Sequence, residues 1–195
     1  MIILLSLLSS AFFSGMEIAY VSSNRLNLEI EKKQKGLIPK LLSIITKDPS
    51  RFISTMLIGN SFALVIYGLF MGQFIVENLS FLFLPSMNEL TILLLQTIIS
   101  TSLILIAAEF IPKVLFQIYS NLSMKIFSIP AFIFYVILYP ITSLVTITSN
   151  FILKTFFKVT NQESQFSFSK LELENYIENE IDKSDDNLDS EIEIF

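Results

Sequence analysis

The sequence contains no cysteine, no histidine and no tryptophan. Without cysteine and histidine, the chain cannot form disulfide bonds, thiolate or imidazole zinc sites, or a Cys or His nucleophile. Any metal that it binds must therefore be held by oxygen atoms, the ligands that hard cations such as Mg²⁺ prefer. We also find no phosphate-binding glycine loop and no nucleophile placed beside a base, so the sequence does not predict an enzyme.

Charged residues are scarce as well, at 16%, whereas 52% of residues are hydrophobic and the mean hydropathy is +0.64. These apolar residues occur in runs that the core of one soluble domain could not bury. A membrane-spanning helix needs about 20 mainly apolar residues, and three segments meet this condition: 2–21, 52–76 and 90–111. The sequence therefore predicts an all-α, multi-pass integral membrane protein with three transmembrane helices.

The loops between these segments differ in charge. Residues 24–51 contain seven lysines and arginines against three acidic residues, whereas 77–89 contain neither lysine nor arginine. Basic loops stay on the cytoplasmic side, so we expect the first loop to be cytoplasmic and the N-terminus to be external. Gly36 divides the first loop, and we expect a cytoplasmic helical pair within residues 25–47.

A fourth hydrophobic stretch, residues 126–153, is interrupted by Pro130 and Pro140 and has a lysine at each end, Lys125 and Lys154. A true fourth span would place one of these basic ends outside the cell. The charge pattern instead favours a bent juxtamembrane belt or a re-entrant segment with both ends in the cytoplasm. The fourth span remains the alternative.

The end of the chain has a different composition. Residues 161–195 contain eleven acidic residues and two lysines, a net charge of −9, whereas residues 1–160 carry +4. The acidic segment is too poor in apolar residues to pack alone. We therefore expect a membrane domain over residues 1–160, in the cell membrane, followed by an acidic cytoplasmic linker over 161–195.

Glu109 is the clearest candidate for a functional residue. An unpaired ionisable group within a membrane helix costs several kcal/mol, so its presence there suggests a function. Pro112 follows closely, and because proline has no amide hydrogen it leaves the Ala108 carbonyl without its usual helical partner. A carboxylate beside a free carbonyl provides two oxygen ligands for a cation. The alternative is an ordinary ion pair between Glu109 and Lys113, four residues further on.

The other two spans also contain polar groups near the same depth. Ser10 and Ser14 share a helix face in the first span, where Gly15 would let the helix unwind, and Gly59 and Asn60 interrupt the apolar second span. Close helix packing and an interhelical hydrogen bond would explain these residues equally simply. Together with Glu109 they predict an oxygen-lined site suited to Mg²⁺.

Glu17 lies one turn beyond Ser14. It could line the same site or pair with Arg25 at the cytoplasmic interface, and the sequence interpretation favours Arg25.

Several motifs resemble the membrane domain of the CorC/CNNM family over about residues 1–160. In order along the chain they are Ser10-Ala11-Phe12-Phe13-Ser14-Gly15-Met16-Glu17, Asn24-Arg25, Asp48-Pro49-Ser50-Arg51-Phe52, Ile58-Gly59-Asn60 and Glu109-Phe110-Ile111-Pro112-Lys113. The resemblance implies a dimeric magnesium transporter, considered a sodium-dependent exporter, with three spans, a helical pair and a belt. It also implies that a pair of CBS modules, which bind ATP, follows in the full-length protein.

The resemblance further implies a metal site formed by Ser10, Ser14, Asn60, Glu109 and the backbone around Ala108, with Mg²⁺ as the transported ion and Na⁺ as the coupling ion. Three positions depart from the family pattern, in which serine, asparagine and glycine are usual: Met16, Ser61 and Ala108. The alternative function is a metal-binding scaffold or sensor that anchors cytosolic CBS modules without transporting ions. No nucleic-acid-binding module is recognisable.

Overall fold

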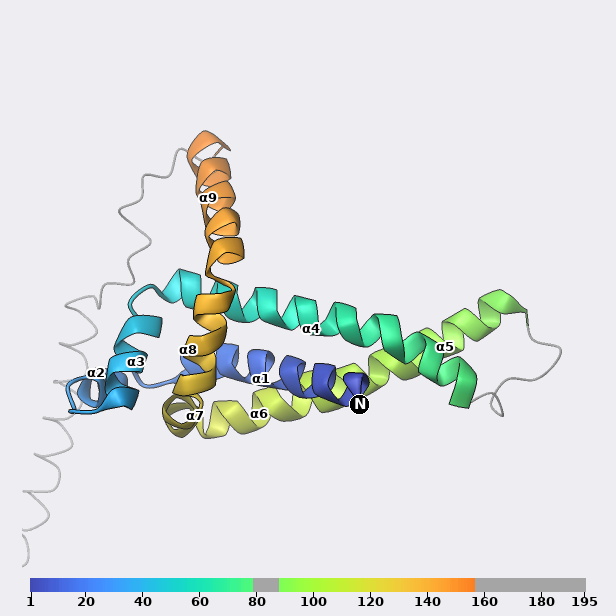
Figure 1. The fold of residues 1–195 in the computed structure, drawn as a ribbon, viewed down its shortest axis with the longest axis horizontal. Coiled ribbons are helices and arrows are strands. Elements are labelled where there is room, and N and C mark those ends of the chain that lie inside the picture. The colour runs from blue at the N-terminus through green and yellow to red at the C-terminus, as the bar shows by residue number, and fades with distance from the viewer. Residues whose placement is uncertain (79–87, 157–195) are drawn as a thin grey trace, which may run out of the picture. The chain divides into compact units, whose positions relative to one another are not determined.

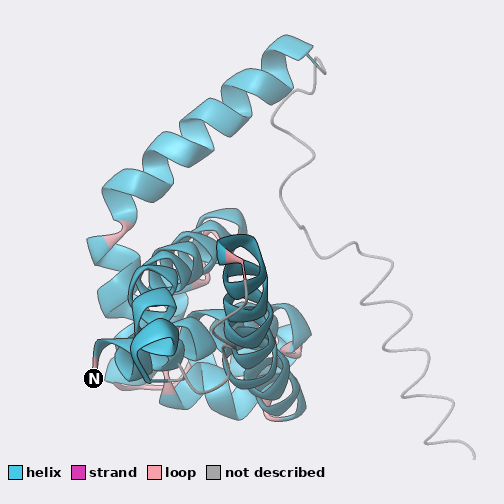
Figure 2. Cartoon of the chain, turned by 90° about the vertical axis from the view of Figure 1, so that its right-hand side faces the viewer, coloured by secondary structure: helices cyan, strands magenta, loops and turns pink. Residues whose placement is uncertain are grey.

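The computed structural model describes residues 1–78 and 88–156, and every regular element among them is a helix (Figures 1 and 2). The chain divides into two compact units, residues 1–149 and 150–195. The second unit is described only over the last residues of helix α9. The predicted acidic linker, 161–195, lies outside the described residues.

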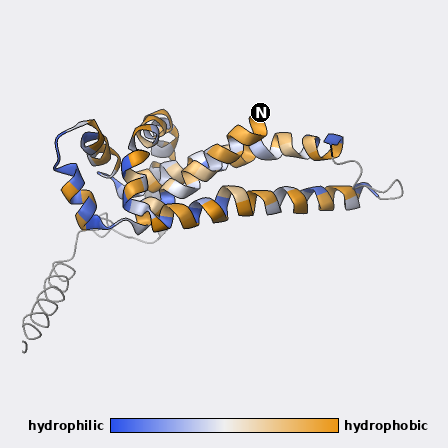
Figure 3. Ribbon diagram, turned by 90° about the horizontal axis from the view of Figure 1, so that it is seen from below, coloured by the Kyte–Doolittle hydropathy of each residue, from blue (hydrophilic) through white to orange (hydrophobic). Residues whose placement is uncertain are grey.

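Three of the helical stretches are long and apolar enough to cross a membrane: Ile2–Ser22, Pro49–Asn78 and Glu89–Ile118. The first is α1 (Ile2–Ser22) and the second is α4 (Pro49–Asn78), while the third is composed of α5 (Glu89–Leu103), the π-helix η2 (Ile104–Phe110) and α6 (Ile111–Ile118). Apolar residues run along these helices, whereas hydrophilic residues gather at the first loop (Figure 3). The predicted all-α membrane fold is confirmed.

The first loop forms two short helices, α2 (Arg25–Lys32) and α3 (Leu37–Ile45). Asn24 begins α2, since its side-chain oxygen accepts hydrogen bonds from the amides of Leu26 and Asn27, 2.9 and 3.3 Å away. Gly36 precedes α3 with φ of 147°, a conformation that L-residues with side chains rarely adopt.

Three helices follow the third span: α7 (Ser120–Ile126), α8 (Ser128–Ile137) and α9 (Tyr139–Phe156). Pro130 and Pro140 lie in the first turns of α8 and α9, where the missing amide hydrogen has no helical partner to lose. The axes of α7 and α8 differ by 66°, and by length and composition this bent pair qualifies as a span only if its two helices are taken together. The sequence predicted a bent segment over residues 126–153. In the structure, the bend lies between α7 and α8, and α7 begins earlier, at Ser120.

Helix α1 is the centre of the first unit and packs against α4, η2, α6 and α7. The main core lies toward the C-terminal end of α1, and its largest fully buried side chains include Met16, Tyr20, Phe52 and Met56. A smaller core lies toward the other end, around Tyr67, Met71 and Ile75 of α4. Both cores depend on the contact between α1 and its neighbours.

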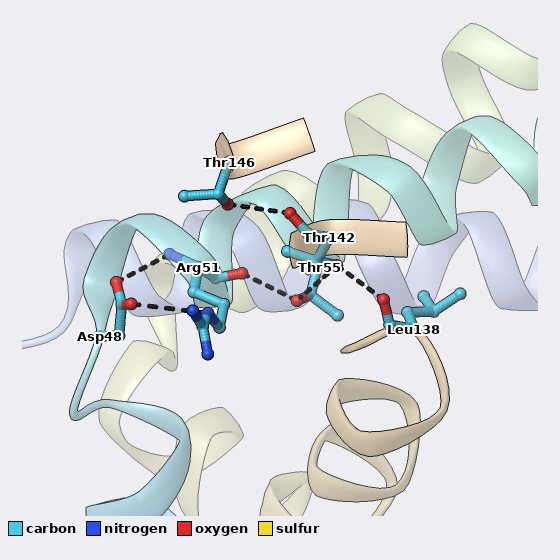
Figure 4. Close-up of polar contacts among 6 residues, drawn as sticks. All are labelled: Asp48, Arg51, Thr55, Leu138, Thr142 and Thr146. Carbon is cyan, nitrogen blue, oxygen red and sulfur yellow. Dashed lines mark hydrogen bonds and ion pairs between the residues drawn. The ribbon is translucent and has the colours of Figure 1, made fainter. Parts of the chain in front are cut away.

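Polar contacts attach the beginning of α9 to the beginning of α4 (Figure 4). The hydroxyls of Thr55 and Thr142 lie 3.3 Å apart, and both residues are fully buried. The Arg51 guanidinium lies 4.8 Å from the centre of the Tyr139 ring and 3.6 Å from an oxygen of Asp48. These contacts hold the first turns of α9 against the second span.

Replacing Thr142 with Val removes the hydroxyl but keeps the side-chain shape. We expect the free energy of unfolding to fall by roughly 0.6–1 kcal/mol, the usual size of an interhelical hydrogen bond in a membrane protein. Thermal unfolding in detergent measures this. Thr148→Val is the control, because Thr148 is exposed on the same helix and, among the described residues, donates to the Leu144 carbonyl in its own helix. Equal losses in both variants would contradict a role for the Thr55 contact.

Candidate metal centre

Two predicted site residues from different spans meet directly. The Ser10 hydroxyl of α1 donates a 2.6 Å hydrogen bond to the side-chain oxygen of Asn60 in α4. Ser10 is fully buried. Gly59 makes this approach possible, because a Cβ atom at that position would lie only 2.4 Å from the Phe13 ring. The interhelical contact therefore depends on the absence of a side chain next to Asn60.

Ser14 lies one helical turn beyond Ser10 on the same face of α1. Its hydroxyl oxygen is buried and makes no hydrogen bond with any described residue. An unpaired buried hydroxyl is unfavourable, and a bound cation or its water would satisfy it. The neighbouring Gly15 permits close packing against α6, since a Cβ there would lie 2.7 Å from the Phe116 ring.

Ala108 and Glu109 lie in the π-helix η2, in which the Ile111 amide donates to the carbonyl of Ile106, five residues earlier. We expected the helix to open at Pro112. The structure instead continues as a helix through Pro112, which lies in the first turn of α6, and the irregularity is the π-helix before it. Ala108 is completely buried, and the Glu109 side chain is 29% exposed.

Glu109 pairs with Lys113, as the alternative interpretation required, but at 4.0 Å the contact is at the outer limit of an ion pair. The Lys113 side chain is 44% exposed, and such a pair contributes little to stability. Within the described residues, the Glu109 carboxylate makes no hydrogen bond to Ser10, Ser14 or Asn60. The structure thus brings Ser10 and Asn60 together, and it places Glu109 in η2, a segment that also packs against α1.

The sequence interpretation favoured an ion pair between Glu17 and Arg25. In the structure, Glu17 lies within electrostatic range of both Lys113 and Glu109. Its spacing from Ser14 and Ser10, three and seven residues, already places it on the same face of α1. The sequence interpretation gave this place in the site as the alternative to pairing with Arg25. By contrast, no pattern in the sequence indicated that Phe116 would pack on Gly15.

The donor set suits a hard cation. The described residues contain no group of three or more acidic, histidine or cysteine side chains that could hold a metal alone. The candidate site instead combines two hydroxyls, one amide oxygen and the nearby carboxylates. Mg²⁺ commonly binds through one or two carboxylates and keeps several waters, so these residues fit a partly hydrated magnesium ion.

The three positions that depart from the family pattern have different surroundings. Met16 is fully buried in the main core, and Ala108 is fully buried where η2 meets α1. Ser61 is exposed and donates to the Leu57 carbonyl in its own helix. The extra bulk at Met16 and Ala108 is therefore accommodated in the packing.

Comparison with known families agrees with these motifs. The sequence matches the family model described as the CNNM, or cyclin M, transmembrane N-terminal domain over residues 1–190. No curated protein matches the sequence. CNNM domains are associated with the transport of metal ions, magnesium among them. Because this match covers nearly the whole chain, the chain belongs to the CNNM family.

Proposed function

We propose that this chain transports Mg²⁺ across the cell membrane, as a sodium-coupled exporter. One observation carries this proposal: the buried Ser14 hydroxyl, without a partner among the described residues, lies one turn from the Ser10–Asn60 hydrogen bond on α1, the helix that also packs against the π-helix bearing Glu109. Unpaired oxygens and a carboxylate at the meeting point of several spans are typical of a transported cation's site. Family membership supports magnesium as the ion.

In this proposal Ser10, Ser14, Asn60 and the backbone carbonyl around Ala108 supply neutral oxygens, while Glu109 supplies negative charge. Mg²⁺ and Na⁺ are the transported and coupling ions, and the site opens alternately to each side. The basic first loop supports a cytoplasmic location for the α2–α3 pair and an external N-terminus. We further propose that the chain works as a homodimer, with ATP-binding CBS modules in the full-length protein.

Purified protein reconstituted in sealed vesicles provides the test. We expect an imposed sodium gradient to move Mg²⁺, read by a magnesium dye inside the vesicles, with the direction of movement reversing when the gradient is reversed. A potassium gradient of equal size is the control and should move none. If Mg²⁺ raises the unfolding temperature but does not cross the membrane under either gradient, the scaffold or sensor function replaces transport.

A further inference from the structure

Tyr67 makes a hydrogen bond at the point where the third span changes from an α-helix to a π-helix. Its ring is fully buried in the smaller core, and its hydroxyl donates to the carbonyl of Ser100 in α5 at 3.2 Å. The same carbonyl accepts the amide of Ile104, the first residue of η2, and this amide is shared with the carbonyl of Thr101. One carbonyl therefore receives both a helical donor and a side chain from another span.

The position of this junction decides which side chains face α1. A π-helix carries more residues per turn than an α-helix, and π-helices are rare in proteins. Contacts with the surrounding structure must therefore stabilise η2. Within η2, Ala108 is completely buried, whereas Leu105, Ile106 and Phe110 are more than half exposed. If the same residues formed a regular α-helix, the segment after Ser100 would be rotated and a different residue would face α1.

A simpler role for Tyr67 is to satisfy its own hydroxyl in an apolar environment. Any carbonyl of the third span within reach of the hydroxyl would meet that role, wherever the π-helix began. The bond is made instead four residues before η2 begins, to the carbonyl that also accepts the amide of Ile104, the first residue of η2.

We propose that Tyr67 is a positioning residue for the ion site. By holding the Ser100 carbonyl, its hydroxyl fixes where the π-helix begins, and so places Ala108 against α1 and Glu109 beside Glu17 and Lys113. The structural part stands on its own, and the consequence for ion binding rests on the proposed function. Tyr67→Phe tests both parts, because it removes the hydroxyl and keeps the buried ring.

The chain has no cysteine, so a single introduced cysteine can carry a spin label at each residue from 105 to 110 in turn. Oxygen accessibility in lipid then maps the exposed face. In the parent protein we expect a minimum at 108 between accessible neighbours. In Tyr67→Phe we expect the minimum to move to another residue. Tyr119→Phe is the control, since Tyr119 is exposed and outside both cores, and it should keep the parent pattern. An unchanged pattern in Tyr67→Phe overturns the proposal, whether or not the protein transports magnesium.

Magnesium flux supplies the second measurement. We expect Tyr67→Phe to raise the KM for Mg²⁺ about fivefold, the scale of one hydrogen bond, with the maximal rate per folded protein unchanged. A purely structural role would lower the amount of folded protein and leave the KM where it was. That result also overturns the proposal. If the parent protein shows no flux, the proposed function fails while the accessibility pattern still decides the role of Tyr67.

Discussion

Glu109→Gln is expected to reduce magnesium flux at least about 100-fold while the protein stays folded and inserted. The substitution keeps the size of the side chain and removes its charge. Even groups that only orient a metal ligand cost 10–100-fold when lost, so a carboxylate that binds the ion should cost more. Flux in reconstituted vesicles measures the change, and the melting temperature without Mg²⁺ shows whether the fold is retained.

Two further variants separate ion binding from the ion pair. Glu89→Gln makes the same chemical change at an exposed position of the same span, and we expect normal flux. Lys113→Gln removes the partner of Glu109 at 4.0 Å, and we expect flux to remain within about threefold of the parent because such a pair is weak. If Lys113→Gln and Glu109→Gln lose flux equally, the pair itself is what matters and Glu109 is not a ligand.

Gly59→Ala is expected to lower the free energy of unfolding more than Thr142→Val does. Alanine normally favours a helix over glycine, but here its Cβ would lie 2.4 Å from the Phe13 ring. That ring is buried and fixed by edge-to-face contacts with Phe12 and Phe134, at centroid distances of 5.4 and 4.8 Å. To make room, the ring would have to leave these contacts and shift toward the cavity of about 390 Å³ that Phe13, Gly59 and Phe134 help to line, and overpacking of this kind costs about 1–3 kcal/mol.

Thermal unfolding in detergent measures this effect, and we expect the unfolding temperature to fall by about 2–12 °C. Gly68→Ala is a matched control on the same helix, since a Cβ at Gly68 meets no atom within 4 Å. Its unfolding temperature should match the parent or rise slightly. If Gly59→Ala is as stable as Gly68→Ala, the close approach of α1 and α4 is not essential to the fold.

The sequence predicted the number of membrane helices and the bounds of the first two to within three residues, because long apolar runs have no other solvent available. The predicted third span ended at 111, whereas the helix continues to Ile118. Lys113 and Gln117 interrupt the apolar run there without ending the helix, since long polar side chains at a helix end can reach water. Hydropathy therefore predicts which part of a helix lies within the membrane, but not the residue at which the helix ends.

The candidate site was predictable in composition but not in arrangement. Spacing placed Ser10 and Ser14 on one face, and the hydrogen bond from Ser10 to Asn60 agrees with their expected common depth. Residue spacing could not predict the π-helix at Ala108 and Glu109. Its position coincides with a hydrogen bond from Tyr67, 33 residues away, and such tertiary contacts leave no periodic signal in the local sequence.

The packing of Phe13 on Gly59 also limits how the helices can move. If α1 slid along α4 by one helical turn in either direction, the Phe13 ring would meet a residue that carries a side chain, such as Met56 or Ala63, instead of a bare backbone. Because buried packing is not continuously deformable, we expect α1 and α4 to move as one rigid body. In the proposed transport cycle, the change of access would then take place along the other boundary, where the helix bearing Glu109 packs against α1.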